Sequence, residues 1–221
     1  MILTCANLTK TYRTERGPVE AVRGVDFVAH PGEFVSVVGR SGSGKSSFLA
    51  MIGGLSRPTI GEVCIDGVEI WRLGESGLAK FRNRRIGFIY QFASLLPSLR
   101  VVDNVALPAL LGKTREPAGV YRDAYPLLEQ FGLGDRVRCY PSELSSGEQR
   151  RVVIARALIN APAVVLADEP TSDLDEATER VIVDRFRELV RARAITLVMV
   201  THNRHLAEQT DRVLNMADGR L

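Results

Sequence analysis

The sequence lacks the features of a membrane-spanning or disulfide-stabilised protein. No apolar run approaches the roughly 18 residues that a membrane span requires. The three cysteines, Cys5, Cys64 and Cys139, stand far apart, and their spacing fits neither a disulfide framework nor a metal site. We interpret them as buried or half-buried free thiols, which agrees with a reducing compartment. We therefore expect a cytoplasmic protein that acts at a membrane only through a partner.

A strong charge of one sign is also missing. The 221 residues include 29 Lys and Arg and 26 Asp and Glu, for a net charge of +3. Nucleic-acid-binding proteins usually gather basic residues on one face, whereas here they are spread along the chain. Two local groups, Arg82 to Arg85 and Arg150 with Arg151, are interpreted as solvated helix faces. We predict no nucleic-acid partner.

Apolar segments alternate with helical segments and predict an α/β fold. Hydrophobic residues make up 45% of the chain, which is enough to bury a core. The patterns predict strands at residues 2–8, 21–29, 34–38, 61–66, 86–90, 163–167, 195–200 and 212–216. They predict helices at residues 45–53, 147–160, 176–193 and 205–210. Residues 11–19, closed by Gly17 and Pro18, read as a turn or loop. We expect a mostly parallel sheet covered on both faces, with an antiparallel β-subdomain at the N-terminus.

The pattern changes between residues 91 and 150. This stretch is rich in helical and loop signals and is punctuated by Pro97, Pro108, Pro117, Pro126 and Pro141. We predict one domain over residues 1–221. Residues 1–90 and 151–221 would form its core, and residues 91–150 an inserted helical subdomain.

A glycine-rich segment follows the strand predicted at residues 34–38. It matches the pattern G-x-x-x-x-G-K-[ST] through Gly39, Arg40, Ser41, Gly42, Ser43, Gly44, Lys45 and Ser46. Glycines let consecutive N–H groups point inward around phosphates, and the next helix directs its N-terminal dipole at the same anion. We expect Lys45 to reach the β- and γ-phosphates, Ser46 to ligate Mg²⁺, and Ser47 to join the phosphate site. The strand before the motif and the helix after it favour a nucleotide site over a surface loop.

Two further strands end in chemically useful side chains. Asp168 and Glu169 follow the strand at residues 163–167, and His202 follows the strand at residues 195–200. The carboxyl ends of parallel strands face the ligand crevice of such sheets. Asp168 is expected to hold Mg²⁺, and Glu169 to polarise the attacking water as general base. His202 is expected to bind the γ-phosphate and steer that water.

Residues 144–149, Leu-Ser-Ser-Gly-Glu-Gln, resemble the L-S-G-G-Q signature of ABC ATPases, and a basic helix follows them in both cases. Other motifs of that family come in order along almost the whole chain. Tyr12 matches the aromatic residue that stacks on adenine, and Gln91 matches the glutamine that contacts the nucleotide and its Mg²⁺. Asp175 matches the loop after the acidic strand, and His202 matches the switch histidine. The resemblance implies the ABC ATPase fold, a RecA-like core and ATP hydrolysis with Mg²⁺.

The resemblance also implies partners. Two such domains close head to tail over two ATP molecules, so that Ser145 and Gly147 of one copy contact the γ-phosphate held by the other. The copies form a homodimer or a pair with a related ATPase. This chain departs from the family at Ser146, which replaces a glycine, and at Glu148, which replaces a glutamine. Ser146 would slightly hinder backbone approach if its φ were positive.

Residues 81–92 and 165–171 are similar to the lipoprotein-releasing and macrolide-export ATPases, although cell-division and peptide-export relatives share much of this pattern. Such subunits lie on the inner face of the cell membrane, bound to an integral membrane permease. We expect that permease to dock near Gln91 and the helical subdomain. The chain ends at Leu221, so we expect no regulatory C-terminal domain.

Two rival functions fit the sequence less well. A soluble ABC ATPase of DNA repair or translation usually carries a long coiled-coil insertion or two ATPase domains, which 221 residues do not accommodate. A P-loop kinase or GTPase would leave residues 144–149, Gln91 and His202 unexplained. The sequence does not identify the transported substrate.

Overall fold

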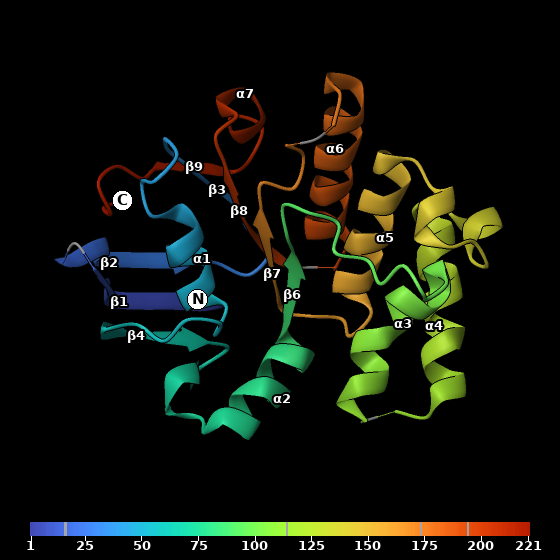
Figure 1. Ribbon diagram of the computed structural model, residues 1–221, viewed down its shortest axis with the longest axis horizontal. Coiled ribbons are helices and arrows are strands. Elements are labelled where there is room, and N and C mark those ends of the chain that lie inside the picture. Colours follow the sequence, from blue (N-terminus) through green and yellow to red (C-terminus); the bar gives the residue numbers. More distant parts are fainter. Residues whose placement is uncertain (16, 114, 173, 194) are drawn as a thin grey trace.

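The computed structural model describes residues 1–15, 17–113, 115–172, 174–193 and 195–221 (Figure 1). Its strands are β1 Leu3–Thr14, β2 Gly17–Ala29, β3 Phe34–Val38, β4 Ile60–Ile65, β5 Val68–Glu69, β6 Ile86–Ile89, β7 Val164–Asp168, β8 Thr196–Thr201 and β9 Arg212–Asn215. Its α-helices are α1 Lys45–Ile52, α2 Glu75–Arg85, α3 Val101–Gly112, α4 Pro117–Gln130, α5 Ser146–Leu158, α6 Glu176–Arg193 and α7 Arg204–Ala207. No helix of these described ranges is both long and apolar enough to cross a bilayer.

Five strands form a parallel sheet in the order β6-β7-β8-β3-β9. Their registers align the carboxyl ends, since Ile89 pairs with Ala167, Asp168 with Val200, and Val38 with Thr201. The segments that leave these ends therefore meet at one edge of the sheet. That edge is where the predicted site residues are gathered.

The second sheet is antiparallel, in the order β2-β1-β4-β5, and confirms the predicted N-terminal β-subdomain. The prediction of a loop at residues 11–19 is wrong, because β1 and β2 continue as a hairpin in which Tyr12 pairs with Val19 and Thr14 with Gly17. Most side chains at the end of this hairpin are exposed on both faces, so the alternation of apolar and polar residues that marks a half-buried strand is absent there.

Two apolar clusters hold the layers together. One face of the parallel sheet, including Val35, Leu166 and Val198, packs against α1 and the antiparallel sheet. The opposite face, including Val165 and Met199, packs against α3, α4, α5 and α6, which lie together on one side of the molecule (Figure 1). The predicted parallel sheet with both faces covered is confirmed, although a second sheet supplies much of one cover.

The helical region differs from the sequence patterns in two ways. Helix α2 was not predicted. Leu78 is the one buried residue among those described in this helix, and the segment has almost no apolar periodicity. Pro108 and Pro126 were expected to punctuate the chain, but they lie inside α3 and α4. Both helices bury an apolar face in the core, and this burial outweighs the backbone hydrogen bond that each proline removes.

Candidate active site

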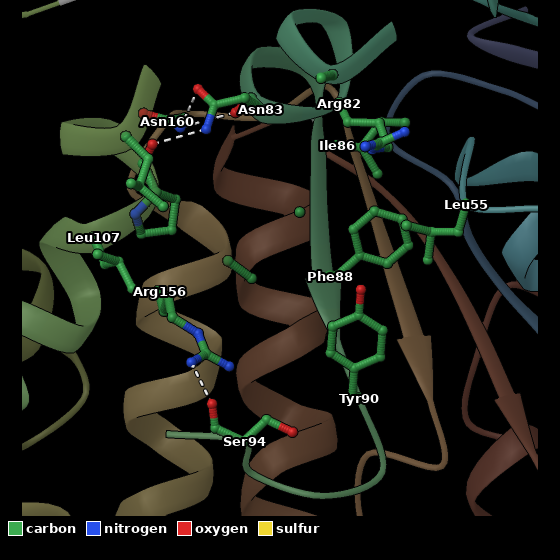
Figure 2. Close-up of a pocket in the computed structure, with 15 residues that line it drawn as sticks. Leu55, Arg82, Asn83, Ile86, Phe88, Tyr90, Ser94, Leu107, Arg156 and Asn160 are labelled. Carbon is green, nitrogen blue, oxygen red and sulfur yellow. Dashed lines mark hydrogen bonds between the residues drawn. The ribbon is translucent and has the colours of Figure 1, made fainter. Parts of the chain in front are cut away.

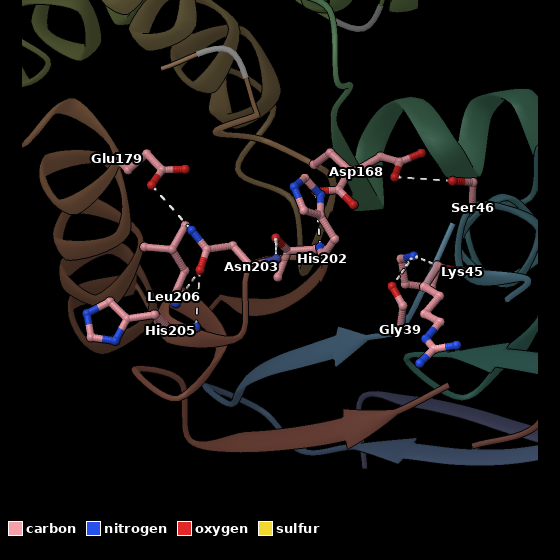
Figure 3. Close-up of polar contacts among 12 residues, drawn as sticks. Gly39, Lys45, Ser46, Asp168, Glu179, His202, Asn203, His205 and Leu206 are labelled. Carbon is pink, nitrogen blue, oxygen red and sulfur yellow. Dashed lines mark hydrogen bonds and ion pairs between the residues drawn. The ribbon is translucent and has the colours of Figure 1, made fainter. Parts of the chain in front are cut away.

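The glycine-rich loop connects β3 to α1 and is curled. Gly42 and Gly44 have φ values of 80° and 104°, which side-chain-bearing residues rarely adopt. A Cβ on Gly44 would also lie 2.2 Å from the carbonyl oxygen of Ala21. The buried Lys45 points its Nζ into the loop and donates to the carbonyl oxygens of Gly39 (2.8 Å) and Arg40 (3.0 Å) (Figure 3). The backbone is thus shaped to surround an anion, with a cation inside it.

Asp168, the last residue of β7, faces the first turn of α1. The Ser46 hydroxyl donates to its Oδ1 over 3.3 Å (Figure 3). Partial burial, followed by the nearby carboxylate of Glu169, raises the pKa of Asp168, while Ser46 and Lys45 oppose this. A hydroxyl and a carboxylate oxygen that face each other are ligands of the kind that Mg²⁺ prefers beside bound phosphates. Among the described residues, no group of three or more His, Cys, Asp or Glu side chains could hold a metal ion.

Glu169 leaves the end of β7 with a φ of 45°, an uncommon conformation for a residue with a side chain. Its N–H donates to the carbonyl oxygen of Val200, which fixes this turn against β8. Its Oε2 lies 2.9 Å from Nδ1 of His202 and accepts a longer bond from the His202 N–H. The carboxylate and the imidazole are therefore held as a pair at the edge of the sheet.

A cavity of about 390 Å³ collects most of the predicted residues. Its lining comprises Ala21, Ser41, Gly42, Gly44, Lys45, Ser46, Ser47, Gln91, Glu169 and His202. A neighbouring cavity of about 790 Å³ adds Gly39, Arg40 and Ser43, together with Arg204, Asn215, Met216, Ala217 and Asp218. Five segments far apart in sequence thus meet around one loop. The sequence patterns missed Ala21 and Asp218, since neither residue belongs to a motif and only the packing of β2 and the C-terminal segment brings them here.

Tyr12 lies beside this site on β1. Its hydroxyl is 3.2 Å from Oγ of Ser47, and its side chain is 40% exposed. The Lys10 ammonium group lies 5.1 Å from the centre of the ring. An accessible aromatic ring at the first turn of α1 is suited to stack on a base whose phosphates lie in the loop.

The N-terminus of α5 carries the signature residues. Ser145 caps the helix, and its N–H and hydroxyl each donate to Oε2 of Glu148 over 2.8 Å. These bonds lower the pKa of Glu148, with a smaller contribution from Arg136 at 3.2 Å. Ser146 is the first residue of the helix and its φ is not positive, so the hindrance anticipated from its side chain does not arise.

The signature residues and Asp175 lie away from the loop of the same chain. Ser145, Gly147 and Asp175 are not among the described residues that line the two cavities. Asp175 instead accepts bonds from the N–H and hydroxyl of Thr178 at the start of α6, and a Cβ on Gly147 would approach Thr178 within 3.2 Å. The three residues thus lie near one another at the ends of α5 and α6. The neighbouring Asp173 is outside the described residues.

The interpretation of the two arginine groups as solvated helix faces is partly wrong. Arg150 is 3% exposed and donates from Nη1 to the carbonyl oxygen of Tyr90 (2.7 Å) and from Nη2 to that of Gln91 (2.6 Å). Arg82 is partly buried and donates to the carbonyl oxygen of Gly54. Sequence spacing gave no sign of these contacts, because their partners are backbone carbonyls distant in the chain. The cysteines are free thiols that are buried or half-buried, as predicted.

Comparisons with known proteins agree with this geometry. Residues 22–172 match the family described as "ABC transporter". The whole chain aligns at 47% identity with 96% of the lipoprotein-releasing system ATP-binding protein LolD of Pseudomonas syringae pv. tomato, and at 44% with 99% of LolD of Porphyromonas gingivalis. The dimeric, post-hydrolysis structure of the ATP-binding cassette MJ0796 bound to ADP and Pi superposes with a TM-score of 0.91 at 36% identity, over 99% of this chain and 96% of that one. CbiO1 of Clostridium perfringens gives 0.87 at 27% identity, over 99% and 86%.

Proposed function

Because this chain belongs to the ABC transporter family, has the fold of that family and is an ATP-binding and ATP-hydrolysing subunit, we propose that it powers a membrane permease of the lipoprotein-releasing type. The high identity to proteins named for lipoprotein release, over the full length of the chain, supports this assignment. The permease would supply the substrate contacts. The chain would then be cytoplasmic and peripheral, held at the inner face of the membrane through that partner.

The contact between Ser46 and Asp168 beside the paired Glu169 and His202 carries the proposed chemistry. The phosphate chain of ATP lies in the loop, with Lys45 at the β- and γ-phosphates. Ser46, Asp168 and Gln91 would hold Mg²⁺, which would neutralise charge on the phosphates. Glu169 takes the proton of the attacking water. His202 binds the γ-phosphate and steers that water.

The rest of the site comes from a second copy or a related cassette. The Ser145 hydroxyl, the Gly147 N–H and the dipole of α5 form an anion-binding helix end, yet they lie away from the loop of their own chain. Head-to-tail closure of two copies would bring this helix end to the partner's γ-phosphate. The dimeric state of the related MJ0796 cassette supports this arrangement. Asp175, beside Gly147 across Thr178, would contribute to the same interface.

The permease is proposed to dock at a third cavity of about 500 Å³, which lies between β6, α2, α3 and α5 (Figure 2). Two large apolar residues lie at its mouth: Leu55 is 47% exposed and Leu111 is 69% exposed. The stacked rings of Phe88 and Tyr90 form one wall. This cavity lies between the core and the helical subdomain. We keep the proposed division of the chain into a core of residues 1–90 and 151–221 and a helical subdomain of residues 91–150. A partner bound in this cavity would move when the core and the helical subdomain move relative to each other.

Co-purification of the chain with its permease tests the docking site. Leu111→Asp places a charge in the apolar wall and is expected to abolish co-purification while leaving ATP hydrolysis by the isolated chain unchanged. Val181→Asp, at another exposed apolar residue on α6, is the control and should still co-purify. Retention of the permease by the Leu111 variant would place the docking surface elsewhere.

A further inference from the structure

A buried arginine joins two parts of the site that sequence motifs treat separately. Arg150 extends from α5 and donates to the carbonyl oxygens of Tyr90 and Gln91, the two residues that follow β6. The fork of a guanidinium group suits two neighbouring carbonyls, and its bonds are short and charge-assisted. With 3% of Arg150 exposed, water does not compete well for these bonds.

In the proposed closed dimer, the two ends of this connection would face different nucleotides. Gln91 lines the cavity of its own chain, beside Lys45 and Ser46. Ser145 caps the same helix that carries Arg150, five residues before it. An α-helix transmits displacement along this distance as a rigid rod, so a shift of the Gln91 backbone moves the helix end that faces the partner's nucleotide.

We propose that Arg150 is a positioning residue that sets the orientation of Ser145 and Gly147 according to the position of Gln91. This inference rests on the proposed closed dimer and on the proposed contact of Gln91 with the bound nucleotide. ATP in one site moves the Gln91 backbone, Arg150 carries that movement to α5, and α5 completes the second site. Arg150 therefore couples the two ATP sites of a dimer, and its effect is cooperative turnover.

Arg156 offers a matched control within the same helix. It donates to the carbonyl oxygens of Ala93 (3.1 Å) and Ser94 (2.9 Å), in the segment that Arg150 also holds. These bonds do not involve Gln91, and Arg156 lies six residues further from Ser145 along α5. Loss of Arg156 removes a similar pair of bonds without breaking the connection between Gln91 and the start of α5.

The test is an ATP titration of hydrolysis by the full-length chain, with thermal unfolding and ADP calorimetry of each variant. Arg150→Gln should lower kcat by about tenfold and bring the Hill coefficient toward about 1, because two buried carbonyls lose their donor. Affinity for ADP should stay at the wild-type value, since Arg150 is not among the residues lining the described loop cavity. Arg150→Lys, which can reach one carbonyl, should restore part of both quantities. Arg156→Gln should keep the wild-type Hill coefficient.

Three results would overturn the proposal. They are wild-type cooperativity in a folded Arg150→Gln protein, an equal loss of cooperativity in Arg156→Gln, and a lower ADP affinity that accounts for the loss of turnover. If Arg150→Gln does not fold, Arg150→Lys decides between the same outcomes. Gln91→Ala is measured in parallel. Wild-type turnover in that variant would reject the role of Gln91 in the proposed function. The Arg150 coupling is measured separately, as ATP-induced dimer formation by Arg150→Gln in a Glu169→Gln background.

Discussion

Nδ1 of His202 lies 2.9 Å from Oε2 of Glu169, although 33 residues separate the two in sequence. The pairing follows from the register of β7 and β8, in which Asp168 is opposite Val200. Glu169 directly follows β7 and His202 directly follows β8, so the sheet places the two side chains together. A carboxylate held by an imidazole therefore lies beside a loop with a buried lysine, where we propose that hydrolysis takes place.

The proposed general base predicts a separation of binding from hydrolysis. Glu169→Gln should bind ATP at near wild-type affinity but hydrolyse it about 100-fold more slowly or worse, because the amide cannot accept the proton of water. The uncleaved nucleotide should then hold two copies together as a stable dimer. Size-exclusion chromatography with and without ATP measures this change. A variant that hydrolyses ATP at the wild-type rate would remove Glu169 from this role.

The cation inside the loop predicts a loss of nucleotide affinity. Lys45→Ala removes the charge expected at the β- and γ-phosphates and should weaken ATP binding by about tenfold or more. Calorimetric titration with ATP provides the measurement. Lys80→Ala, at an exposed residue of α2, serves as the control and should bind ATP as the wild type does. Equal affinities in the two variants would contradict the assignment of Lys45.

The environment of Asp168 predicts a pH-dependent stability. Burial raises its pKa, so the folded state binds a proton more readily than the unfolded state does. The favourable contribution of the protonated form is complete below the ordinary carboxyl pKa and is lost as the pH rises through the raised value. Asp168→Asn should therefore raise the melting temperature of the nucleotide-free chain at neutral pH, by no more than about 2 °C. This advantage should disappear in acid.

Thermal unfolding across acid and neutral pH tests the effect of Asp168. Asp184→Asn, an exposed carboxylate of α6, is the control and should change little at any pH. The Asp168 variant should also lose most of the extra stabilisation that Mg²⁺ adds to ATP. A lower melting temperature at neutral pH would show that the charge of Asp168 stabilises the empty site.

The cap of α5 predicts an effect on dimer formation. Glu148 is ionised at neutral pH, since its bonds from Ser145 lower its pKa, and it lies at the helix end proposed to approach the partner's γ-phosphate. Glu148→Gln removes a negative charge and keeps an acceptor for the cap. In a Glu169→Gln background it should lower the ATP concentration needed for dimer formation by about two- to fivefold.

Glu143→Gln is the matched control for Glu148. Glu143 accepts a bond from the Tyr140 N–H in the preceding turn, and its side chain is exposed. Its variant should require the same ATP concentration as the parent. Weaker dimer formation in the Glu148 variant would show that the carboxylate supports the interface instead of repelling phosphate.

Local patterns predicted the regular elements that contribute buried faces. Helix α6 and strand β3 begin and end at the predicted residues, because each has a clear apolar period or a continuous apolar run bounded by turns. The end of the hairpin between β1 and β2, at residues 11–19, and helix α2 were not predicted, for the opposite reason. Their side chains are largely exposed, so burial left no periodic trace in the sequence.

The sequence by itself determined the family, the α/β class and the chemistry of the glycine-rich loop, because these depend on short motifs whose backbone requirements are local. The tertiary structure alone decided what surrounds the loop. The alignment of strand ends joined Glu169 to His202, and packing brought Ala21 beside Gly44. It also turned Arg150 from an apparent surface charge into a buried donor to Gln91. Such contacts join residues far apart in the chain, often through backbone carbonyls that every residue carries, so no sequence pattern encodes them.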